Sequence, residues 1–161
     1  MSRHKVLILT ISHIWFDTRI YFKIIKSLIK KDTEILLITG NEKENEDIDK
    51  EENLTIIKHP NAGKHTLLKH FIIEGLNFKP TSIICIEPLT LLAGLVLKKK
   101  SNCRVIYDAH EYYLDAYKEK KSLLYYPYRF YETNLAKQTD AIITVNEGLV
   151  NIYKHDQLPM Y

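Results

Sequence analysis

The sequence predicts an α/β fold with a doubly wound, mainly parallel sheet that carries helices on both faces. Short apolar runs rich in β-branched residues alternate with stretches of helical periodicity, which is typical of βαβ units. The runs are apolar almost throughout, as expected for strands that are covered on both faces. Because right-handed crossovers permit few arrangements, we expect six strands in the order 3-2-1-4-5-6.

Each expected element follows from its local pattern. Residues 18–31 repeat apolar side chains every four positions, which predicts a helix, and Asp17 before them is a suitable N-cap. The strands are expected at residues 5–11, 34–39, 54–58, 82–87, 104–108 and 141–145. The further helices are expected at residues 65–78, at 88–100 with Pro88 in the first turn, in two pieces of 111–137 with the second starting at Pro127, and from about residue 147 onward.

Composition narrows the class of protein. The chain has 161 residues, of which 45% are hydrophobic and 27% charged, so we expect one folded domain and exclude collagen-like and wholly disordered chains. The net charge of +3 is too small to indicate nucleic-acid binding. Cys85 and Cys103 both lie in apolar runs, which favours reduced thiols. Because the N-terminal apolar run is too short for a signal peptide, we expect a cytoplasmic protein without a membrane span.

Several ligand classes are excluded by what the turns lack. The turn after the first strand, residues 10–20, contains no glycine, so a dinucleotide-binding loop is not expected. No Gly-Lys-Ser or Gly-Lys-Thr follows a strand, which excludes a P-loop. His65 and His70 are five residues apart, about 140° around a helix, and no cysteine or carboxylate cluster completes a ligand set. We therefore expect no metal site.

Polar side chains are concentrated at the carboxyl ends of the predicted strands, where open parallel sheets bind ligands. They are Ser12, His13, Asp17 and Arg19 after the first strand, Glu87 after the fourth, Asp108, His110 and Glu111 after the fifth, and Asn146 and Glu147 after the sixth.

Three segments together resemble the N-terminal, acceptor-side domain of GT-B glycosyltransferases, specifically the large retaining family 4. They are HIWFDTRIYF at 13–22, VIYDAHEYY at 105–113 and KQTDAIITVNEGLVNIY at 137–153. In that family the first loop commonly holds Asp-x-Arg, matched by Asp17 and Arg19, and the fifth strand commonly ends in Asp-x-His-Glu, matched by Asp108, His110 and Glu111. The resemblance spans nearly the whole chain.

The resemblance implies a Rossmann-like domain of a two-domain, metal-independent enzyme. This half would bind a cell-surface glycan or lipid-linked acceptor, and a second Rossmann-like half with a Glu-x7-Glu pattern would bind the nucleotide-sugar. No cofactor is expected on this half. We expect residues 1–161 to be an excised or truncated N-terminal domain that is inactive alone and has the donor-binding domain as its partner. The alternative is a non-catalytic binding or scaffold module that acts through another chain.

Roles can be assigned to the candidate residues. The resemblance implies that His110 is catalytic, hydrogen-bonding the transferred sugar and stabilising charge, whereas a histidine that caps local backbone is the alternative. Asp17 is favoured as an N-cap, and Arg19 as the partner of Asp17 or another carboxylate, with an anionic ligand as the alternative. The substrate-binding candidates are His13, Asp17, Arg19, Glu87, Asp108, Glu111 and Asn146.

The segment 111–137 is rich in tyrosine and lysine. Packing in the core or against a partner domain is the favoured interpretation. A patch at the inner face of an anionic membrane is the alternative, because aromatic bodies and lysines suit that interface. Glu132 and Asp140 are expected to be structural.

Overall fold

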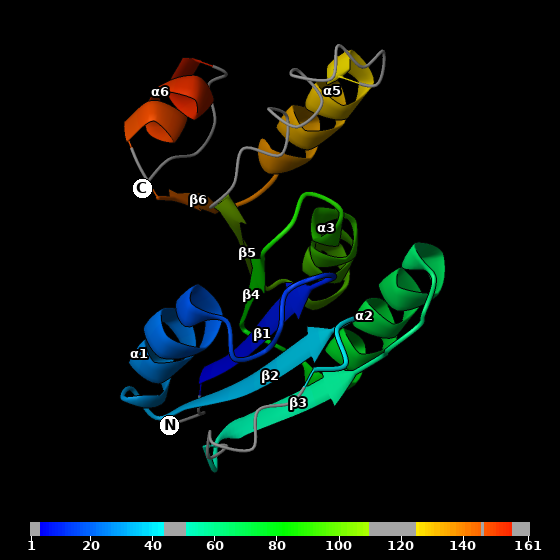
Figure 1. The fold of residues 1–161 in the computed structure, drawn as a ribbon, viewed down its shortest axis with the longest axis vertical. Helices are drawn as coiled ribbons and strands as arrows, with labels where there is room; N and C mark the ends of the chain where they lie inside the picture. Colours follow the sequence, from blue (N-terminus) through cyan, green and yellow to red (C-terminus); the bar gives the residue numbers. More distant parts are fainter. Residues whose placement is uncertain (1–3, 44–50, 110–124, 146, 156–161) are drawn as a thin grey trace.

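The computed structural model of the protein describes residues 4–43, 51–109, 125–145 and 147–155. Its centre is a sheet of six parallel strands in the order β3-β2-β1-β4-β5-β6, which confirms the predicted topology (Figure 1). Each strand lies within two residues of its predicted bounds. The strands are β1 (His4–Thr10), β2 (Thr33–Thr39), β3 (Leu54–Lys58), β4 (Ser82–Cys85), β5 (Arg104–Ala109) and β6 (Ala141–Thr144).

Helices cover both faces of this sheet, as predicted. Figure 1 shows α1 on one face and α2 and α3 on the other. None of the described helices is long and apolar enough to cross a bilayer. The helical elements are η1 (Thr18–Ile25), α1 (Lys26–Ile29), α2 (Lys64–Phe78), α3 (Thr90–Ser101), α5 (Tyr125–Ala136) and α6 (Glu147–His155).

Alternate residues of β1 point into two separate cores. Leu7 and Leu9 belong to the core beneath α2 and α3, whereas Val6 and Ile8 belong to the core beneath η1. Successive side chains of a strand point to opposite faces, so an uninterrupted apolar strand supplies both cores at once. This explains why the sequence shows continuous apolar runs instead of alternation.

The helix expected at residues 18–31 differs from the prediction in its winding. Residues Thr18–Ile25 form a π-helix, in which the N–H of Lys26 donates to the carbonyl of Tyr21, five residues earlier. Only Lys26–Ile29 continue as an α-helix. Five-residue hydrogen bonds bring residues i and i+5 toward one face, and Ile20 and Ile25 are both fully buried. Four-residue spacing in the sequence therefore indicated a helix without revealing its wider turn.

The helix expected from Pro88 begins at Thr90 instead. Pro88 and Leu89 lie in a turn that the N–H and hydroxyl of Thr90 close by donating to the carbonyl of Glu87, at 2.9 and 2.6 Å. The preceding strand ends at Cys85, two residues before its predicted end. Cys85 and Cys103 are both buried and form no disulfide, and burial raises the pKa of the Cys85 thiol to about 12.

Glu132 lies in the core beneath α2 and α3, where it joins β5 to α6. Its Oε1 accepts hydrogen bonds from the hydroxyls of Tyr107 and Tyr153, at 2.8 and 2.9 Å. Its Oε2 is buried and has no hydrogen-bond partner among the described residues. Burial raises the pKa of Glu132 above its ordinary value, although the two hydroxyls act in the opposite direction. The structural role expected for this residue is consistent with these contacts.

Glu132→Gln is expected to flatten the pH dependence of stability. A carboxyl whose pKa is raised on folding stabilises the folded state fully below its unfolded pKa, and this contribution is lost as pH rises through the folded pKa. Wild type should therefore lose stability relative to Glu132→Gln as pH rises above the ordinary value of 4.5. Urea unfolding midpoints measured over this range test the prediction, and parallel curves for the two proteins would contradict it.

Candidate functional site

The loops after β1, β4 and β5 meet at one edge of the sheet. All strands are parallel, so their carboxyl ends share that edge. β1 lies between β2 and β4, and strand order reverses between β1 and β4, which is where open α/β sheets bind ligands. We call residues 11–17, between β1 and η1, the first loop. Together with Glu87 and Asp108, this loop and Arg19 form the candidate site.

Arg19 and Asp108 form an ion pair that joins the start of η1 to β5. The Nε of Arg19 donates to Oδ2 of Asp108 at 2.8 Å and to Oδ1 at 3.1 Å, and Nη2 also donates to Oδ1. The side chain of Asp108 is fully buried and that of Arg19 is 21% exposed. The hydrogen bond to Asp108 raises the pKa of Arg19. Arg19 thus pairs with a carboxylate other than Asp17, within the favoured prediction of an ion pair with Asp17 or another carboxylate.

Asp17 is the N-cap of η1, as predicted. Its Oδ1 accepts from the backbone N–H of Arg19 at 2.8 Å and of Ile20 at 3.3 Å. This cap fixes the backbone of Arg19 while Asp108 holds its guanidinium. Asp17 and Asp108 therefore fix the backbone and the side chain of Arg19, respectively. The π-helical turn that follows is an element often found at functional sites.

Glu87 holds the first loop against β4. The residue is 5% exposed, and its Oε1 accepts from the hydroxyl of Thr10 at 2.9 Å and from the N–H and hydroxyl of Ser12 at 3.0 Å. The N–H of Ile11 lies 3.0 Å from both carboxylate oxygens. His13 Nε2 is 3.9 Å from Oε1. A single carboxylate therefore fills the space beside the first backbone N–H groups after β1.

The end of β2 holds the same loop from the other side. The hydroxyl of Thr39 donates to the carbonyl of His13, and the side-chain amide of Asn41 donates to the carbonyl of Ser12, both at 2.9 Å. Gly40 permits this approach, because a Cβ there would lie 2.6 Å from the carbonyl oxygen of Ile11. The first loop is therefore fixed by both strands that flank β1.

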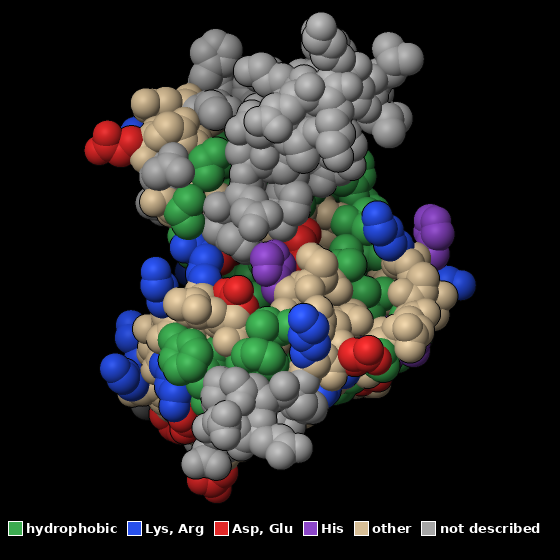
Figure 2. Space-filling model, viewed as in Figure 1, with side chains coloured by type: hydrophobic (Ala, Val, Ile, Leu, Met, Phe, Trp, Pro, Cys, Tyr) green, Lys and Arg blue, Asp and Glu red, His purple; other side chains and the backbone are tan. Residues whose placement is uncertain are grey.

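The charges described at the site suit hydroxyl groups better than phosphate. Asp17, Glu87 and Asp108 contribute three carboxylates, and Arg19 contributes one cation whose charge Asp108 already balances. A phosphate would meet a net negative field, whereas neutral hydroxyls can both donate and accept. Figure 2 shows acidic and histidine side chains at the centre of the displayed face, while basic side chains line its left side over η1 and α1.

The structure brings five of the predicted site residues together, and three others lie outside the described residues. His13, Asp17, Arg19, Glu87 and Asp108 come together at this edge. His110, Glu111 and Asn146 lie outside the described residues, so their roles stay predictions. Sequence reasoning missed Thr10, Thr39 and Asn41, which position the loop. Their position at or just after the ends of neighbouring parallel strands is the signal that could have found them.

Comparisons with known proteins locate the fold. No protein-family model matches the sequence, and no curated protein matches it. Among solved structures, sucrose-phosphate synthase from Thermosynechococcus elongatus is similar with a TM-score of 0.75 at 10% identity, over 99% of this chain and 47% of that chain. TcCGT1, solved in complex with UDP, is similar with a TM-score of 0.66 at 10% identity, over 99% of this chain and 50% of that chain.

A second sucrose-phosphate synthase structure from the same organism gives a TM-score of 0.67 at 11% identity, over 98% of this chain and 86% of that shorter chain. The chain thus spans about half the length of the first two structures. These neighbours are GT-B glycosyltransferases, and the likeness shows that the protein has the fold of a GT-B domain.

Proposed function

We propose that the protein is the acceptor-side, N-terminal domain of a retaining, metal-independent glycosyltransferase similar to family 4. It would present a cell-surface glycan or lipid-linked acceptor to a nucleotide-sugar bound on a second Rossmann-like domain. The GT-B fold and the match to about half of two glycosyltransferases support this division of labour. A membrane-linked acceptor also fits Phe22, which is 53% exposed beside the exposed Lys23 on η1.

The contacts of Glu87 carry the proposal. In nucleotide-binding Rossmann domains the N–H groups after the first strand face a pyrophosphate. In this protein the N–H groups of Ile11 and Ser12 donate to the Glu87 carboxylate, each at 3.0 Å. A built-in anion therefore occupies the place that a phosphate would need. We assign donor binding to the other domain and the hydroxyl-rich acceptor to this one.

The ion pair between Arg19 and Asp108 would position the reacting group. Asp108 lies two residues before His110, and its anchorage fixes the end of β5 from which that segment continues. In the proposed reaction His110 hydrogen-bonds the transferred sugar and stabilises the charge that develops as the glycosidic bond to the nucleotide breaks. Such a contact lowers the barrier only if it strengthens in the transition state.

Calorimetry tests the assignment of the donor to the other domain. Titration of the 161-residue chain with UDP- and GDP-sugars is expected to give no saturable heat. Glu87→Gln should not acquire tight nucleotide-sugar binding either. Removing the charge of Glu87 leaves a first loop that still lacks the glycines that admit a pyrophosphate. Micromolar binding by the wild-type chain would show that acceptor and donor halves are assigned wrongly.

In an enzyme that contains both halves, His110→Ala is expected to reduce turnover by about 100-fold or more, the scale of losing one aligned polar donor. The melting temperature should change little. The matched variant Asp17→Ala should instead lower the free energy of unfolding by about 1 kcal/mol through the lost cap, with a smaller effect on turnover. A His110→Ala enzyme that is unstable yet fully active per folded molecule would assign His110 a structural role. Unchanged turnover and stability would show that His110 takes no part in catalysis.

A further inference from the structure

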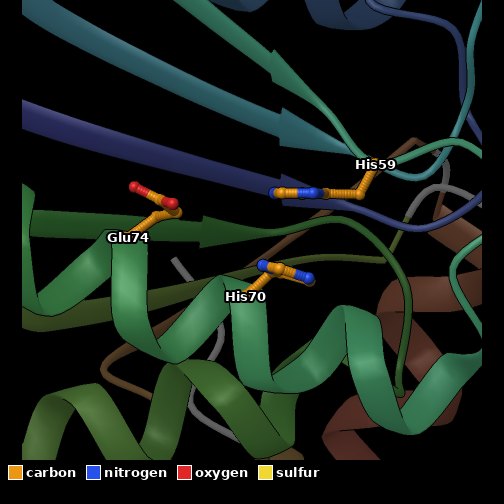
Figure 3. Close-up of side chains that lie close together, drawn as sticks. All are labelled: His59, His70 and Glu74. Carbon is orange, nitrogen blue, oxygen red and sulfur yellow. The ribbon is translucent and has the colours of Figure 1, made fainter.

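A second group of potential ligands lies at the β3 end of the sheet, between β3 and α2. His59 follows β3 directly, and His70 and Glu74 project from α2 toward it (Figure 3). One potential ligand atom from each of these three side chains lies within 4.8 Å of the other two. All three residues are partly buried. The cluster therefore joins the end of the edge strand to the helix that packs on it.

The fold sets the positions of these side chains independently of any ligand. His70 and Glu74 are four residues apart on α2, so they lie on one face of the helix. His59 is held by its backbone: its N–H donates to the carbonyl of Thr39 at 2.9 Å, and its carbonyl accepts from the N–H of Ala62 at 3.3 Å. Pro60 follows and restricts the backbone of His59 to extended conformations.

One buried nitrogen of this cluster has no hydrogen-bond partner among the described residues. That atom is Nε2 of His59. A buried polar atom without a partner costs free energy, and a cation or an ordered water at this position would remove that cost. Burial, followed by the neighbouring His70, lowers the pKa of His59.

We propose that His59, His70 and Glu74 bind one divalent transition-metal cation of the Zn²⁺ type. Two imidazoles and one carboxylate form a ligand set typical of zinc, with a fourth position left for water. The ion would act as a clamp between the end of β3 and α2. Asp108 lies on β5, and β2, β1 and β4 separate that strand from β3, so this ion would take no part in sugar transfer.

Binding requires a defined local rearrangement. The rings of His59 and His70 are stacked, with centroids 3.8 Å apart and planes 17° apart. A metal lies in the plane of each imidazole that binds it, so one ring must turn out of the stack. Tetrahedral ligands about 2.1 Å from zinc lie about 3.4 Å from one another, so the ligand atoms must also move closer. Rotations of the His59, His70 and Glu74 side chains would have to produce both changes.

This cluster escaped sequence analysis because its members come from two elements. Helical spacing compared His70 with His65, which is exposed and does not belong to the cluster. The partner of His70 is instead His59, which lies before the helix. His65 is therefore a matched control, because it is another α2 histidine close to the cluster in sequence.

Titration of the full chain with Zn²⁺, and with Co²⁺ as a spectroscopic probe, tests the proposal. We expect one saturable site per chain, a visible Co²⁺ spectrum of four-coordinate intensity, and a melting temperature that rises with Zn²⁺. His59→Ala, His70→Ala and Glu74→Gln should each weaken binding by about 100-fold or more, beyond the range found for outer-shell partners. His65→Ala and His4→Ala should leave it unchanged.

Three results would overturn the proposal: no saturable binding by the wild-type chain, equal affinity in His70→Ala and wild type, or an equal loss in His65→Ala. If His59→Ala fails to fold, the α2 variants His70→Ala and Glu74→Gln decide the question, with circular dichroism confirming their fold. Loss of Co²⁺ intensity in both variants supports the three-ligand site. Intensity retained in both contradicts it.

Discussion

Arg19→Met is expected to lower the free energy of unfolding by about 3 kcal/mol. The substitution leaves the fully buried carboxylate of Asp108 without its cation, and breaking a buried pair from one side costs about 3 to 5 kcal/mol. We place the effect at the lower end of that range because the Arg19 side chain is 21% exposed, which lets water screen the charge. Urea unfolding of wild type and variant measures the difference.

The double variant Arg19→Met with Asp108→Asn should recover much of the lost stability. Removing both charges leaves no unpaired carboxylate, so the two effects should not add. Lys26→Met is a suitable control, because Lys26 pairs with Glu51 at the surface, where its side chain is 41% exposed. That variant should change stability far less. Additive single effects at Arg19 and Asp108 would contradict the assigned ion pair.

Glu87→Gln is expected to lower the free energy of unfolding by about 3 kcal/mol, the upper part of the range for hydrogen bonds to charged groups. One carboxylate oxygen becomes an amide nitrogen, which faces the N–H of Ile11 as a second donor. The charge that Ser12 donates to is lost as well. Denaturant unfolding measures the stability change.

Hydrogen exchange shows whether that loss is local to the first loop. The amides of Ile11 and Ser12 should exchange faster in Glu87→Gln, while those of β3 should change no more than the global stability requires. Glu34→Gln provides a control at an exposed carboxylate, which lies 3.4 Å from Lys5. Equal protection of Ile11 and Ser12 in wild type and Glu87→Gln would contradict the role given to this carboxylate.

Local patterns in the sequence were sufficient to predict the strands, their order and the N-cap at Asp17, because each depends on neighbours in the chain or on the handedness of crossovers. Pairing over long distances was not predictable in the same way. Nothing near Arg19 indicates that Asp108, 89 residues later, accepts its hydrogen bonds. Arg19 and Asp108 were nevertheless both predicted to be site residues, because parallel strands bring their carboxyl ends to one edge of the sheet.

Buried polar networks were the least predictable features. Glu132 was expected to be structural, yet its two tyrosine partners come from β5 and α6 and depend on how those elements pack. The π-helical hydrogen bonding of η1 also depends on tertiary packing, because it goes together with full burial of Ile20 and Ile25, which are five residues apart. Residue spacing alone does not distinguish the two kinds of helical turn.

The contacts that lock the first loop have a consequence for how the protein folds during synthesis. Glu87 closes on Ser12 across 75 residues, and Arg19 pairs with Asp108 across 89. Strands β1, β2 and β3 can associate as soon as they leave the ribosome, but β1 then still exposes the edge that β4 later covers. Contacts between residues so distant in sequence form slowly because loop closure precedes them. The contacts of Glu87 with the first loop can form once β4 and Glu87 have been synthesised. The pair between Arg19 and Asp108, and with it the complete candidate site, forms only after β5 has been synthesised.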